Sequence, residues 1–223
     1  MRVSPPTTML WKAVLFLMVI TPGVSLLIRV VEKRFDGPWL MISDLGTTQP
    51  EGTVFALGLF LTSILSFILL LRIYQRFEAY SDNFFSIGIL LGLAWSVGLL
   101  VVAFNDSSAS PKLHNIGAGI TFTSLPLSSL SLAIWAKKIT PENKIGMPKG
   151  GYVLPSISIL TTVLFYASHE FAHYVHSGVI LMSEMEGGPG WFALFTTLEW
   201  FLGLVSIGII WSWGPMVVKV GVE

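Results

Sequence analysis

Six stretches of about 20 mainly apolar residues recur along this chain of 223 residues, and they constrain the fold more than any other feature. An α-helix needs a stretch of that length to cross roughly 30 Å of hydrocarbon. Charged residues make up 12% of the chain, about half of what a soluble domain carries. We therefore predict an all-α, polytopic membrane protein, with one six-helix transmembrane domain over residues 1–223. The predicted spans are residues 9–31, 54–74, 84–104, 114–136, 152–173 and 191–213.

The basic residues predict the orientation of these spans, because loops rich in Lys and Arg stay in the cytosol. Nine basic residues lie on the side that holds both predicted termini, and four lie on the other side. The nine are Arg2, Lys12, Arg72, Arg76, Lys137, Lys138, Lys144, Lys149 and Lys219; the four are Arg29, Lys33, Arg34 and Lys112. We expect both termini to be cytosolic.

Charge and cysteine content exclude several functions. The formal net charge is zero, with 13 basic and 13 acidic residues, so nothing indicates a nucleic-acid partner. The chain has no cysteine, which excludes disulfides, thiol catalysis and iron–sulfur clusters.

Polar residues at membrane depth gather at one level, on the extracytoplasmic or luminal side. His114 begins the fourth span at its outer end, and Glu199 lies roughly 12 Å into the sixth span from that side. The predicted outer loops add Asp44, Glu51, Asn105 and Asp106. Ionisable groups are costly in lipid, so such a cluster is a candidate functional site. Polar helix packing is the alternative interpretation.

A second candidate is the His-rich end of the fifth span. On a helix, His169, His173 and His176 share one face, and neutral imidazoles at this spacing are good ligands for zinc or another divalent metal. With Glu170, the segment also matches the H-E-x-x-H motif of zinc hydrolases, and Glu199 could be a further ligand. A non-metal acid/base site and structural polar packing are the competing interpretations.

Three sequence blocks resemble the DRAM/Frag/Sfk family of six-span membrane proteins. The first block, Ile42-Ser43-Asp44-Leu45-Gly46 through Pro50-Glu51 and on to Phe55, is similar to its "ISD-x-G-x-x-x-P-E…F" signature. The second block runs from Gly98 to Asn105 and then through His114, Gly117, Ala118 and Phe122. The third block is Leu198-Glu199-Trp200.

This resemblance implies a role connected with lipids of the outer or luminal leaflet. Members of the family include a protein needed for fatty-acid remodelling of GPI anchors, and the residues before and around Glu199 most resemble that branch. Membrane lipids are therefore the expected partners, and other membrane proteins are a further expectation.

Three hypotheses follow for the activity. In the first, the protein remodels lipid acyl chains: His169 or His173 is the general base, Glu199 orients it, and His114 completes the catalytic group. Binding of the substrate is then assigned to Asp44, Glu51, Asn105, Asp106 and Trp200. In the second, the protein is a non-catalytic lipid-binding or scaffolding subunit. In the third, it is a metal-dependent hydrolase that uses His169, His173, His176 and Glu199.

Overall fold

The computed structural model describes residues 7–34, 41–143, 151–175 and 191–220, and every regular element in these ranges is helical. The long helices are α1 (Thr7–Val31), α2 (Glu51–Phe77), α3 (Asn83–Phe104), α4 (Pro111–Asn143), α5 (Val153–Val175) and α6 (Trp191–Ser212). Short helices complete the order: the 3₁₀ turns η1 (Ser43–Gly46) and η2 (Glu78–Tyr80), and α7 (Gly214–Val220).

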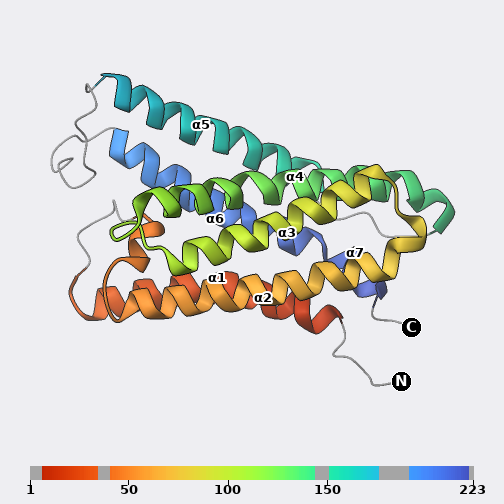
Figure 1. The fold of residues 1–223 in the computed structure, drawn as a ribbon, viewed down its shortest axis with the longest axis horizontal. Coiled ribbons are helices and arrows are strands. Elements are labelled where there is room, and N and C mark those ends of the chain that lie inside the picture. Colours follow the sequence, from red (N-terminus) through yellow and green to blue (C-terminus); the bar gives the residue numbers. More distant parts are fainter. Residues whose placement is uncertain (1–6, 35–40, 144–150, 176–190, 221–223) are drawn as a thin grey trace.

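The six long helices lie side by side and run up and down in chain order (Figure 1). Each packs against the next along the chain from α1 to α6, and α1 also contacts α6 and α7. Turn η1 lies at one end of the bundle, near the starts of α2, α4 and α6. We call this the η1 end and the opposite end, which holds η2 and α7, the η2 end.

The helical class is confirmed, and each predicted span falls on a helix. Five helices are long and apolar enough to cross a membrane: those that begin at Thr7, Glu51, Asn83 and Pro111, and the segment Thr196–Val218. Within the part of α5 whose side chains the structure describes, the apolar segment is Val153–Ala167. Large apolar side chains such as Leu90 and Leu160 are exposed on the outside of the bundle, as a lipid-facing surface requires. The sixth crossing and the orientation stay predictions.

Helices α3 and α4 approach closely because small residues lie between them. A Cβ atom on Gly98 would lie 2.6 Å from Oγ1 of Thr121 and 3.0 Å from the carbonyl oxygen of Gly117. Further along, the Ser128 hydroxyl donates a 2.6 Å hydrogen bond to the Gly88 carbonyl. Small residues and interhelical hydrogen bonds are what hold helices together in lipid, where no hydrophobic effect acts between them.

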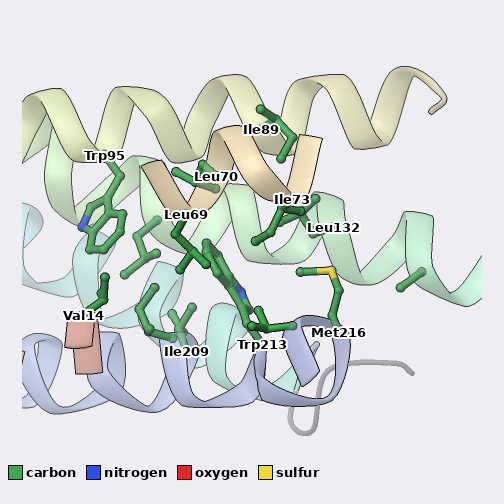
Figure 2. Close-up of a cluster of buried hydrophobic side chains, with 14 of the residues drawn as sticks. Val14, Leu69, Leu70, Ile73, Ile89, Trp95, Leu132, Ile209, Trp213 and Met216 are labelled. Carbon is green, nitrogen blue, oxygen red and sulfur yellow. The ribbon is translucent and has the colours of Figure 1, made fainter. Parts of the chain in front are cut away.

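The packed core fills the η2 half of the bundle. Figure 2 shows Leu70 and Ile73 of α2 facing Leu132 of α4, with Trp213 and Met216 from the C-terminal helices closing the cluster. The indole of Trp11 donates a 2.7 Å hydrogen bond to the Ile210 carbonyl and so joins α1 to α6 at this end. The η1 half is less completely filled, and the candidate site lies there.

Candidate functional site

A cavity of about 280 Å³ occupies the η1 half of the bundle. Its walls come from α1, α2, α3, α4 and α6, and most of the lining side chains are apolar. Trp95, which also belongs to the packed core, lines the cavity between the two regions. The polar groups His114, Glu199 and Ser43 line the cavity at the η1 end. The arrangement is an apolar chamber with a polar end.

Glu199 holds turn η1 against α6. The side chain is 6% exposed, and its two carboxylate oxygens accept hydrogen bonds from the backbone N–H groups of Ile42 (3.1 Å) and Ser43 (3.2 Å). These two N–H groups belong to the residues that start the turn, where a short helix leaves its amides without internal partners. Glu199 therefore joins two segments that are 156 and 157 residues apart in sequence.

Asp44 stabilises the turn itself. Its carboxylate accepts a 3.0 Å hydrogen bond from the Met41 N–H, while its carbonyl accepts one of 3.0 Å from the Arg29 guanidinium. Burial raises the pKa of Asp44 above its ordinary value, although the Met41 N–H and the positive charge of Arg29 act in the opposite direction. Arg29 also donates to the Arg34 carbonyl, so the end of α1 is joined to η1.

Glu51, at the start of α2, is fully buried, with a side chain that is 0% exposed. Arg34 forms an ion pair with it at 2.7 Å, and the Thr48 hydroxyl donates to the same carboxylate. The Ser25 hydroxyl of α1 lies 3.3 Å from the Glu51 carbonyl. The buried charge of Glu51 is thus satisfied by Arg34 from the chain that follows α1 and by Thr48 from the turn before α2, while Ser25 of α1 bonds to the Glu51 backbone.

His114 is 5% exposed and lies in the first turn of α4. Its Nδ1 is 2.8 Å from the carbonyl oxygen of Asn105. Because a carbonyl oxygen can only accept, Nδ1 carries the hydrogen, and in the neutral ring Nε2 is an acceptor. Asn105 in turn donates from its side-chain amide to the Val101 carbonyl at 2.8 Å.

Asp106 has a local role in the turn between α3 and α4. Its carboxylate accepts hydrogen bonds from the N–H groups of Ser108 (2.9 Å) and Ala109 (2.7 Å) and from the Ser108 hydroxyl. The Ser108 hydroxyl and the Ala109 N–H hold the pKa of Asp106 below its ordinary value. Asp106 is not among the residues that line the cavity.

The structure brings several of the candidate residues together at the η1 end. His114, Glu199 and Trp200 line the cavity, Asp44 and Glu51 secure the adjacent loop, and Asn105 positions His114. His169, Glu170 and His173 lie on α5, but their side chains are outside the described residues, and so is the whole of His176. Among the described side chains, no three His, Asp or Glu residues are grouped to hold a metal ion. The zinc site and the His169–Glu199 pair stay predictions.

Sequence reasoning missed two features of the site. The sequence analysis uses Arg29 and Arg34 for the orientation of the spans, whereas in the structure Arg29 bonds to the Asp44 carbonyl and Arg34 pairs with Glu51, so both secure the loop around η1. The sequence offered one signal for the Arg34 contact: an acidic residue, Glu51, follows Arg34 by 17 residues, just before the second predicted span. The apolar wall formed by Ala118 and Gly203 left no signal, because small residues usually indicate helix packing.

Together, the long apolar helices and the apolar outer surface define an integral membrane protein, and its helical bundle encloses a cavity with a polar end. A family model described as the Frag1/DRAM/Sfk1/Cwh43P N-terminal domain matches residues 5–214. The chain belongs to this family, which confirms the resemblance of the three sequence blocks. No curated protein and no solved structure matches the chain significantly.

Proposed function

We propose that this protein binds a membrane lipid of the outer or luminal leaflet, with the acyl chain in the cavity and the polar part near His114 and Glu199. The observation that carries the proposal is the cavity, which is apolar along its length, polar at the η1 end and open toward the lipid-facing surface. Small-molecule sites are typically apolar clefts with a few polar groups that fix orientation.

The opening lies between α1 and α6. Most of the lining residues are buried or partly buried, but Val19 and Gly23 of α1 and Leu204 of α6 are exposed. The exposed fractions of Val19 and Leu204 are 54% and 63%. Because these side chains belong to the apolar outer surface, the opening faces the hydrocarbon of the bilayer instead of water. A ligand would therefore enter from the membrane.

The depth of the cavity suits one leaflet. Its lining on α4 runs from His114 to Phe122, which is about 12 Å along the helix axis. One leaflet contributes about half of a hydrocarbon core that is roughly 30 Å thick. A volume of about 280 Å³ is at the low end of ligand pockets and suits one acyl chain better than two.

The proposal places the η1 end outside the cytosol, with six crossings and both termini inside. The excess of basic residues at the η2 end supports this orientation. Since the chain lacks cysteine, single cysteines report the sides cleanly. We expect Ser108→Cys to react with an impermeant maleimide on intact cells, and Gln75→Cys to react only after the membrane is made permeable. The reverse pattern, or labelling of both on intact cells, would contradict the orientation.

Filling the cavity should displace the lipid. Ala118 lies one helical turn below His114 and lines the cavity, so Ala118→Phe would place a ring where the acyl chain is proposed to lie. We expect wild-type protein, purified in mild detergent, to retain about one lipid per chain by native mass spectrometry, and Ala118→Phe to lose most of it.

The matched control is Ile116→Phe. Ile116 is on the same helix, but it is exposed and does not line the cavity. The Ile116→Phe protein should therefore retain as much lipid as the wild type. Equal lipid occupancy in Ala118→Phe and the wild type, with both folded, would refute lipid binding in this cavity.

Catalytic lipid remodelling is a second candidate, favoured by one observation. His114 presents a ring to the cavity while its other nitrogen is held by Asn105, which is how an imidazole base is commonly oriented. Remodelling of GPI anchors would be one such activity. Loss of acyl exchange in cells that carry His114→Asn in place of the wild-type protein would favour this candidate over simple binding.

A further inference from the structure

We infer that the cavity selects a neutral, hydroxyl-bearing, single-chain lipid, whose hydroxyl donates a hydrogen bond to Nε2 of His114. This inference rests on the proposed lipid-binding function and adds the chemical class of the ligand. It follows from three features of the cavity: the hydrogen-bonding state of His114, the charged groups around His114, and the shape of the apolar part below His114.

The hydrogen-bonding state comes first. Nδ1 of His114 is occupied by the Asn105 carbonyl, so it must be the protonated nitrogen of the neutral ring. Among the residues that the structure describes, none bonds to Nε2 of this ring, although the side chain is 5% exposed and lines the cavity. An acceptor that faces an apolar cavity gains from a hydrogen-bond donor, and a ligand hydroxyl supplies the donor that Nε2 lacks.

The charges exclude an anionic headgroup. Glu199 lines the same end of the cavity, and its carboxylate is bonded to two neutral backbone N–H groups, not to a cation. Asp44 and Asp106 place two further acidic side chains near His114. No Lys or Arg belongs to the described lining, and Arg29 and Arg34 are directed to the loop around η1. A phosphate or carboxylate here would lie beside acidic side chains and would find no cation in the described lining to bind it.

The apolar part suits one chain and offers the headgroup little else. Below His114, the cavity passes between Ala118 of α4 and Gly203 of α6 toward Trp95. The Thr121 hydroxyl, which also lines this part, donates to the Gly117 carbonyl at 2.8 Å and is engaged within its own helix. The hydroxyl at the head of the chain is therefore the polar feature that His114 can recognise, and the chain itself is recognised by its fit.

Three probes with the same oleoyl chain separate these features. 1-Oleoylglycerol carries hydroxyls and no charge, methyl oleate carries neither a hydroxyl nor a charge, and 1-oleoyl-lysophosphatidate carries a phosphate. Binding to full-length protein in nanodiscs is measured by competition against a photoreactive fatty-alcohol analogue, with the crosslinked peptide identified by mass spectrometry. We expect 1-oleoylglycerol to compete about tenfold better than methyl oleate, and the lysophosphatidate to compete worst.

Two substitutions separate the roles of the two ring nitrogens of His114. In His114→Asn, the side-chain amide takes the place of Nδ1 and still donates to Asn105, but nothing takes the place of Nε2. In His114→Gln, the amide takes the place of Nε2. We expect His114→Asn to lower the affinity for 1-oleoylglycerol to that for methyl oleate and to leave methyl oleate unchanged. We expect His114→Gln to retain part of the preference.

The outcomes separate the two levels of the proposal. If all three probes compete equally in the wild type, or if the phosphate probe competes best, the ligand class is wrong while lipid binding stands. If His114→Asn keeps the full preference for 1-oleoylglycerol, His114 is not the acceptor. If no probe competes and Ala118→Phe crosslinks as the wild type does, the lipid-binding function itself fails. The comparison of probes on the wild type is decisive even if a variant does not fold.

Discussion

Glu199→Ala is expected to release turn η1 from α6 and to lower the free energy of unfolding by about 2–4 kcal/mol. The reason is that the N–H groups of Ile42 and Ser43 both lose their acceptor, and each unsatisfied buried group costs about 1–3 kcal/mol. The side chain of Leu45, fully buried in the same turn, should become accessible at the same time. Thermal unfolding followed by tryptophan fluorescence would measure the first effect.

Accessibility is measured with Leu45→Cys, the sole thiol in an otherwise cysteine-free chain. The thiol should be protected from a maleimide when Glu199 is present and should react when Glu199 is Ala. Thr197→Ala, on an exposed position of the same helix, is the matched control and should change neither quantity. Glu199→Gln keeps one acceptor oxygen, so its thiol reactivity and its thermal stability should lie between those of the wild type and those of Glu199→Ala. A protected thiol and an unchanged melting temperature in Glu199→Ala would show that the carboxylate does not hold the loop.

Arg34→Ala is expected to lower the free energy of unfolding by more than the loss of an exposed ion pair would, because it leaves the carboxylate of Glu51 buried without its cation. Breaking a fully buried pair typically costs about 3–5 kcal/mol, and the effect here is smaller because Arg34 is 33% exposed. Adding Glu51→Gln removes the buried charge and should restore part of the loss. The double-mutant cycle, measured by chemical denaturation in detergent, gives the coupling between the two side chains.

Glu32 provides the control for this cycle. It also forms an ion pair with Arg34, but its side chain is 42% exposed, so Glu32→Ala should cost less than about 1 kcal/mol. If Glu32→Ala and Glu51→Gln lower the free energy of unfolding equally, or if the double-mutant cycle gives no coupling energy between Arg34 and Glu51, this pair does not stabilise the loop.

The helical class and helix positions could be predicted because hydropathy over 20 residues is a property of the local sequence. Helix α4 is the instructive case: the span predicted to end at residue 136 continues as helix to Asn143. The helix continues beyond the apolar segment because its hydrogen bonds form within the backbone, whether or not lipid surrounds it. Hydropathy locates the apolar part of a helix and says little about where the helix stops.

The sequence analysis named candidate residues for the site, but it did not predict the contacts that these residues make. Charge at membrane depth drew attention to His114 and Glu199, and the structure places both in the lining of one cavity. The partner of Glu199 was expected to be a histidine, yet its observed bonds are to the backbone of residues 42 and 43. Every residue except proline carries a backbone N–H, so no pattern of residue types could indicate which N–H groups bind Glu199. The cavity was likewise invisible, since it arises from how five helices meet.

The bonds from Glu199 to backbone amides also determine which positions can vary. Every amino acid except proline offers the same N–H group, so the two amides at positions 42 and 43 would be presented equally well by many different residues. Position 199 has no such freedom, because only a side chain with two acceptors of the right reach can serve both amides. The loop can therefore diversify the chemistry that it displays outside the bundle while its attachment to the bundle stays the same.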